Sequence, residues 1–215
     1  MANVNLGEIV RDGKLQIARA VAIEEYAKVE QSLSWLFAGL LGTTRDKAGV
    51  VFFRLTNTHS RNSIIESLLQ KNHGLIYRTY WSGTQQHGGL FTLLRQLDSR
   101  RNEIVHWHVV MSVGGDPAKT SESLHPPNFW NRTPTTQSIG LAELEDFTLK
   151  ADFVGRSINM FTAFTDPSMN PHFAADNSAA WQGIFEQPIT YPPPDTHPLS
   201  RQNVVPGIPR PSSQG

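Results

Sequence analysis

The chain has 215 residues with 19 basic and 19 acidic side chains, so its formal net charge is zero. Hydrophobic residues make up 39% of it, which is enough for a packed core and excludes a wholly disordered chain. The balanced charge argues against a protein that coats nucleic acid through an excess of lysine and arginine. The absence of cysteine excludes disulfide scaffolds, zinc ribbons, iron–sulfur clusters and cysteine nucleophiles.

The start of the chain and its apolar runs indicate no membrane association. Residues 1–12 lack the basic segment followed by an apolar stretch that is typical of a signal peptide. The most apolar runs, 35–41 and 48–53, are far shorter than the roughly 18–20 residues that cross a bilayer. Because the chain also lacks cysteine, which fits a reducing compartment, we expect a cytoplasmic protein.

Two helices are predicted in the first third of the chain. From Leu15 to Leu41, apolar residues recur at spacings of three and four, and Gly42 follows as a stop signal. A second helix is expected to begin after Thr44, as its N-cap, and to end near 73–74. Its polar middle, residues 56–62, makes this second pattern less uniform.

Two further helices are predicted after residue 90, separated by a long loop. The third helix carries its periodic positions at Leu90, Leu94, Leu97, Arg101, Ile104 and His108. The fourth begins near Ser138 or Leu141 and continues through Phe161. The loop between them, 112–139, is rich in Gly, Pro, Ser and Thr, and a loop of this length is either functional or contains a short hairpin.

Proline content separates the end of the chain from the helical region. Of 14 prolines, 10 lie in the last 50 residues, and none precedes Pro117. The sequence therefore predicts an all-α fold, an up-and-down bundle of four to five helices in residues 1–165. Residues 166–215 are expected to form a Pro-rich, largely irregular tail, which serves as a linker or binds a protein partner.

The third helix contains an arginine, a polar residue and a histidine in the pattern R-N-x-x-x-H, formed by Arg101, Asn102 and His106. A second match to Arg-x4-His runs from Arg54 to His59, but a leucine follows its arginine. In the first match the polar Asn102 follows the arginine, and the match lies on a long predicted helix. We therefore interpret the second match as coincidental.

These residues give the chain a resemblance to the HEPN superfamily, helical bundles named for nucleotide binding in higher eukaryotes and prokaryotes. Many HEPN proteins are metal-independent endoribonucleases with an R-x(4–6)-H motif on a late helix, which Arg101, Asn102 and His106 match. The similarity covers about residues 15–165 and includes the first helix, with Glu24, Glu25, Glu30 and Trp35. In many HEPN toxins a modifiable tyrosine follows the histidine by two positions, where this chain has His108.

The resemblance implies an RNA-cleaving site that needs no metal or other cofactor. His106 would act as general base or acid, because an imidazole exchanges protons near neutral pH. Arg101 would bind the scissile phosphate with its fork of donors, and Asn102 would assist. The product would carry a 2′,3′-cyclic phosphate, and DNA, which lacks the 2′-hydroxyl, would not be cleaved.

Helix geometry adds a condition to this site. On an ideal helix, Arg101 and His106 are roughly 140° apart, whereas Asn102 and His106 share a face with Ser99 and Arg95. Either the helix is distorted at the motif, or two copies pack through this helix and each contributes to a composite site. The second option predicts a homodimer.

Four further residues are candidates for substrate binding, namely Arg100, Arg95, His108 and Trp81. Arg100 would fit an Arg-x5-His register. Trp81 lies in an aromatic and cationic stretch, 77–81, of a kind that can stack bases but more often packs against a bundle end. The loop residues His125, Phe129, Trp130 and Arg132 present the same two alternatives.

The sequence thus favours a HEPN-type endoribonuclease of bacterial defence or toxin systems, with RNA as its partner. A second hypothesis is a non-catalytic HEPN-like module that binds RNA, a nucleotide or a partner protein. A third is a dimeric adaptor whose Pro-rich tail recruits another protein. No H-x3-H or HExxH spacing occurs, so no metal site is expected.

Overall fold

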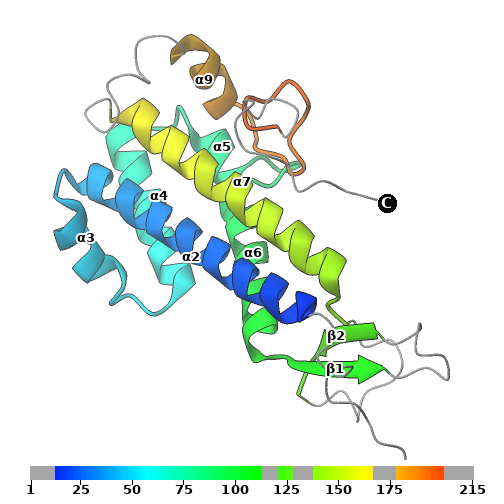
Figure 1. Cartoon of the computed structure of the whole chain (residues 1–215). Helices are drawn as coiled ribbons and strands as arrows, with labels where there is room; N and C mark the ends of the chain where they lie inside the picture. The colour runs from blue at the N-terminus through cyan, green and yellow to red at the C-terminus, as the bar shows by residue number, and fades with distance from the viewer. Residues whose placement is uncertain (1–12, 113–120, 128–137, 167–177, 201–215) are drawn as a thin grey trace, which may run out of the picture. The chain divides into compact units, whose positions relative to one another are not determined.

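The computed structural model describes residues 13–112, 121–127, 138–166 and 178–200 (Figure 1). Most of this part of the chain is helical, as predicted. Its elements are α2 (Lys14–Leu41), α3 (Arg45–Phe52), α4 (Thr58–His73), α5 (Arg78–Ser82), α6 (Leu90–His106), β1 (His108–Ser112), β2 (Ser121–His125), α7 (Leu141–Thr165) and α9 (Ser178–Phe185).

The chain divides into two compact units. Unit 1 comprises residues 1–34 and 93–155, and unit 2 comprises residues 35–92 and 156–215. Helices α2, α6 and α7 each contribute residues to both units. The division at residue 166, expected from proline content, stays a prediction.

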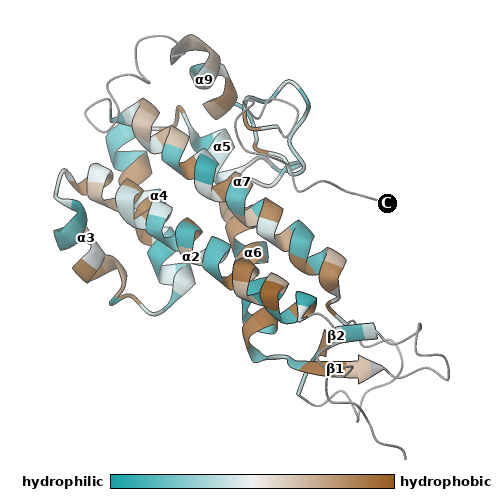
Figure 2. Cartoon of the chain, in the orientation of Figure 1, coloured by the Kyte–Doolittle hydropathy of each residue, from teal (hydrophilic) through white to brown (hydrophobic). Residues whose placement is uncertain are grey.

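Unit 1 is built from the first part of α2, most of α6, the hairpin and the first part of α7. Each helix buries one face, and Figure 2 shows hydrophilic and hydrophobic residues mixed along each of the long helices, as this arrangement requires. Its buried hydrophobic side chains include Leu15, Tyr26, Leu33, Leu94, Leu97, Ile104, Leu124, Ile139, Leu144, Phe147 and Val154.

Unit 2 has an aromatic core. The Phe161 ring of α7 lies 5.1 Å from the Trp81 ring and 5.0 Å from the Phe185 ring, measured between centroids. Tyr80 completes the cluster, with its ring 5.0 Å from that of Phe185. Edge-to-face contacts of this kind add to the hydrophobic stabilisation of a core and fix the orientation of the rings.

The second predicted helix is two helices, so that prediction was wrong in its detail. α3 ends at Phe52, and α4 begins only after Asn57, whose side-chain oxygen accepts a hydrogen bond from the Ser60 backbone N–H at 3.1 Å. The break falls at the polar middle of the pattern because an asparagine there satisfies the first free N–H groups of a new helix. Thr44, the expected N-cap, precedes α3 but makes no side-chain capping bond.

The third helix is shorter than predicted. α6 ends at His106, and His108 is the first residue of β1, where it pairs with His125 of β2 in an antiparallel register. The β-branched pair 109–110 favours a strand over a further helical turn. The long loop therefore contains a short hairpin, the second of the two alternatives for it.

Part of the Pro-rich segment is packed into unit 2. Its residues 178–200 include α9 and bury Trp181, Phe185, Ile189 and Leu199. Among the described helices, none is both long and apolar enough to cross a bilayer.

Candidate active site on helix α6

A stripe of polar side chains runs along one exposed face of α6. Arg95, Ser99, Asn102 and His106 are all exposed and follow one another at helical spacings of four, three and four. Such spacings place side chains one above the other on a helix. The stripe ends at His106, the last residue of α6.

Arg101 lies beside this stripe and is turned toward α2. Its guanidinium carbon is 5.6 Å from the centre of the Tyr26 ring, and its Nη1 donates a 3.1 Å hydrogen bond to Oδ1 of Asn102. Its Nε is buried and has no hydrogen-bond partner among the described residues. No carboxylate in the described part of the chain forms an ion pair with Arg101, so its charge is not neutralised there.

The Tyr26 side chain connects α2 to an acidic residue of α6. Its hydroxyl donates a 2.9 Å hydrogen bond to Oδ1 of Asp98, one turn before Arg101. The ring is buried and stacks on Phe147 of α7 at a centroid distance of 6.4 Å. Tyr26 therefore presents a ring face to the arginine and its hydroxyl to the aspartate.

The end of α6 is anchored by a residue of α2. Arg19 Nη2 donates a 2.7 Å hydrogen bond to the backbone carbonyl of Val105. The last carbonyls of a helix lack partners within the helix, and a cation there also interacts favourably with the helix dipole. Arg19 thereby fixes the turn that carries His106.

Helix α6 is unbroken through the motif. It is α-helical to His106, and the Trp107 N–H continues the pattern by donating to the Glu103 carbonyl at 2.9 Å. The distorted-helix alternative is therefore wrong. Among the described contacts, none joins Arg101 to His106, so a single copy does not bring the two side chains together through a direct bond.

Arg100 lies on the side of α6 that faces α7. It lines a groove of about 610 Å³ between α6 and α7, together with Gln96, Ser99, Glu143, Asp146 and Lys150 among others. Its Nη1 forms a 2.9 Å ion pair with Glu103. In the same groove Lys150 donates to Gln96 at 2.6 Å, and burial lowers the pKa of Lys150. Unlike Arg101, Arg100 thus has its charge matched by a carboxylate.

The other candidate residues lie outside the α6 stripe. His108 is exposed on β1, opposite His125, and the His125 Nε2 lies 3.0 Å from the Ser123 hydroxyl. Trp81 is buried in the aromatic core of unit 2. Phe129, Trp130 and Arg132 lie outside the described residues. Within the described part of the chain, no group of three or more His, Asp or Glu side chains could hold a metal ion.

Comparisons with known protein families, with curated proteins and with solved structures find no match to this chain.

Sequence reasoning missed two residues that shape this site. Tyr26 occupies one of the regularly spaced apolar positions of the first predicted helix, and the sequence analysis did not single out Arg19. A tyrosine at a buried helical position is a usable signal, because its hydroxyl needs a hydrogen-bond partner. Arg19 has no comparable local signal, because its partner is a backbone carbonyl far along the chain.

Proposed function

We propose that this chain is a metal-independent endoribonuclease of the HEPN type. The observation that carries the proposal is the composition of the last two turns of α6. There Arg101, which has no carboxylate partner among the described residues, bonds to the exposed Asn102, and the exposed His106 lies one turn further on along the face of Asn102. A phosphate group could supply the negative charge that Arg101 lacks, since guanidinium donors match phosphate oxygens.

The site would be completed by a second copy of the chain. The straight helix keeps Arg101 and His106 on different sides, but two α6 stripes facing each other across a two-fold axis would bring both histidines to one phosphate. The exposed stripe of polar residues from Arg95 to His106 is the surface that would meet its copy.

The reaction would be an intramolecular transesterification of RNA. One His106 takes the proton of the 2′-hydroxyl, whose oxygen attacks the phosphorus atom. The bond to the 5′-oxygen breaks, and His106 of the second copy donates the proton that this leaving oxygen needs. Arg101 holds the non-bridging oxygens as charge develops on them, and Asn102 keeps the guanidinium in place. The products are a 2′,3′-cyclic phosphate and a 5′-hydroxyl.

The test is cleavage of single-stranded RNA in the presence of EDTA. We expect the wild-type protein to cut, and Arg101→Ala and His106→Ala each to lower the rate constant by about 100-fold or more, because general acid–base groups contribute on the order of 10²–10⁴. A substrate with 2′-deoxyribose at the scissile position should stay intact.

The matched controls are the arginine and the histidine of the second Arg-x4-His match. Arg54 lies in the turn after α3 and His59 in α4, so this pair does not share a helix. Arg54→Ala and His59→Ala should cut RNA at the wild-type rate. Loss of cleavage in these two variants, or its persistence in His106→Ala, would contradict the proposed site.

The second candidate function is a non-catalytic module that binds RNA. It is favoured by the hydrogen bond from Arg101 to its neighbour Asn102 and by the lack of any contact between Arg101 and His106 among the described residues. In that case the wild-type protein would retain RNA without cutting it. His106→Ala would bind equally well, and Arg101→Ala would bind more weakly.

A further inference from the structure

Arg101 has an acidic neighbour on its own helix with which it does not pair. Asp98 lies three residues earlier on α6, and side chains at this spacing are neighbours on a helix surface. Arg100 and Glu103 have the same spacing and do form an ion pair, at 2.9 Å. Among the described contacts, no bond joins Asp98 to Arg101, so a further group must keep this pair apart.

The Tyr26 side chain of α2 is the group that contacts both residues. Its hydroxyl donates a 2.9 Å hydrogen bond to Oδ1 of Asp98, and the centre of its ring lies 5.6 Å from the guanidinium carbon of Arg101. The Tyr26 side chain is 5% exposed and its ring stacks on Phe147, so its orientation is fixed by packing. Tyr26 thus binds the carboxylate through its hydroxyl and the arginine through its ring.

The result is a guanidinium that is available to an anion. Arg101 is half-buried, and its contacts in the described part of the chain are with the Tyr26 ring and with Oδ1 of Asn102. Neither contact brings a negative charge to the guanidinium. A partly desolvated guanidinium attracts an anion strongly, and its planar set of donors matches phosphate oxygens.

We infer that Tyr26 is a positioning residue, which keeps Arg101 open to a phosphodiester group by holding Asp98 away from it. Without the tyrosine hydroxyl, the Asp98 carboxylate would pair with Arg101 and compete with phosphate. The role of this effect in RNA cleavage rests on the proposed function. Whether Arg101 is open, and whether it binds phosphodiester groups, can be measured without cleavage.

Side-chain ¹⁵N–¹H spectra test the first part of the inference without a ligand. The Arg101 Nε is buried, which slows exchange of its proton with water, and the signal lost in Arg101→Lys assigns it. Tyr26→Phe keeps the ring beside the guanidinium but removes the hydroxyl, and should shift the Arg101 signal. Combining Tyr26→Phe with Asp98→Asn should return the signal to near its wild-type position. Asp98→Asn alone should leave it there, because the wild-type carboxylate is not paired with Arg101.

A ten-nucleotide single-stranded DNA tests the second part, because it carries phosphodiester groups but no 2′-hydroxyl. In the wild type we expect it to shift the Arg101 signal in a saturable way. Tyr26→Phe should weaken DNA binding about fivefold or more, because an ion pair with Asp98 must then be broken. The double variant should bind within about twofold of the wild type, since it lacks the competing carboxylate.

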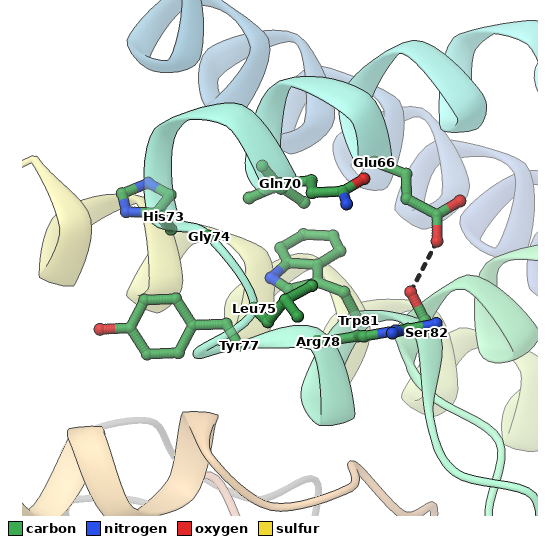
Figure 3. Close-up of a pocket in the computed structure, with 10 residues that line it drawn as sticks. Glu66, Gln70, His73, Gly74, Leu75, Tyr77, Arg78, Trp81 and Ser82 are labelled. Carbon is green, nitrogen blue, oxygen red and sulfur yellow. Dashed lines mark hydrogen bonds between the residues drawn. The ribbon is translucent and has the colours of Figure 1, made fainter.

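Tyr77 provides the matched control. It precedes α5 in unit 2 and lines a cavity of about 130 Å³ there. Figure 3 shows its hydroxyl pointing away from the other residues that line the cavity, and this hydroxyl has no hydrogen-bond partner among the described residues. Tyr77→Phe makes the same chemical change without releasing a carboxylate. It should leave both the Arg101 signal and the DNA affinity unchanged.

Three results would overturn the inference. The first is an unshifted Arg101 signal in a folded Tyr26→Phe protein, as would occur if Asp98 paired with Arg95 instead. The second is equal DNA affinity of the wild type and Tyr26→Phe. The third, which does not depend on the folding of Tyr26→Phe, is a large shift of the Arg101 signal in Asp98→Asn. A wild-type protein that binds DNA through Arg101 but leaves RNA intact would contradict the ribonuclease proposal and support this inference.

Discussion

At the scale of single residues, two histidines of unit 2, His73 and His197, lie in surroundings that favour the neutral form of the imidazole. The Leu199 backbone N–H donates a 3.1 Å hydrogen bond to His197 Nδ1, so this nitrogen must carry a lone pair and the proton must reside on Nε2. The His197 ring also lies edge-on to Trp181, at a centroid distance of 6.2 Å. Burial lowers the pKa of His197 from its usual 6.5, and burial lowers the pKa of His73 in the same direction.

This arrangement makes the stability of the protein depend on pH. Because the pKa of His197 is lower in the folded than in the unfolded chain, the stabilisation is complete above about 6.5 and is lost as the pH falls through the folded-state value. His197→Asn keeps an acceptor for the Leu199 N–H but cannot be protonated. We expect its melting temperature to fall less than that of the wild type between pH 7 and pH 5, measured by calorimetry.

The control for this measurement is an exposed histidine. His59→Asn, in the first turn of α4, should leave the pH dependence of the melting temperature unchanged. An identical decrease for the wild type and His197→Asn would show that protonation of His197 does not limit stability in acid.

At the scale of secondary-structure elements, a capping residue, Asn57, begins α4 after the short turn that separates it from α3. Asn57 accepts the Ser60 N–H through its side chain, and the preceding residues leave the helical path after Phe53. Replacement by alanine leaves that N–H without a side-chain acceptor. We expect Asn57→Ala to lower the free energy of unfolding by about 1 kcal/mol, measured by urea denaturation.

A conservative substitution distinguishes capping from other roles of Asn57. Serine also caps helices well, so Asn57→Ser should lower the free energy of unfolding by only a few tenths of a kcal/mol, roughly. Equal destabilisation by alanine and serine would contradict the capping role.

The same elements show which helix bounds the sequence pattern predicts and which it does not. The long helices α2 and α7 follow from uninterrupted spacing of apolar residues, and both begin and end within a few residues of their predicted bounds. At the α3–α4 break and at the end of α6, the free energy of continuing the helix is similar to that of ending it. There Asn57 and the β-branched residues after Trp107 outweigh a continuing helical pattern.

Part of the candidate site was also predictable, because helical spacing determines which side chains share a face. The spacing of residues along α6 correctly placed Asn102 and His106 on one exposed face. Which of the two adjacent arginines has an ion-pair partner was not predictable. Arg100 pairs with Glu103 within its own helix, whereas the surroundings of Arg101 come from Tyr26, far away in the sequence.

At the scale of the whole molecule, the proposed activity depends on association of two copies. If the site is composite, the specific activity should rise with protein concentration through the dissociation constant of the dimer. We expect RNA cleavage per molecule to increase over the micromolar range, in parallel with the dimer fraction from light scattering. Cleavage by a protein that stays monomeric throughout that range would exclude the composite site.

The bond between Arg19 and Val105 has a consequence for how the motif can be used. The two residues are 86 positions apart, yet the donor from the start of the chain caps the turn that carries the histidine. Transplanting only the segment from Arg101 to His106 into another protein would therefore transfer the motif residues without the hydrogen bond from Arg19. In such a graft we expect the last helical turn, which carries His106, to be partly unfolded.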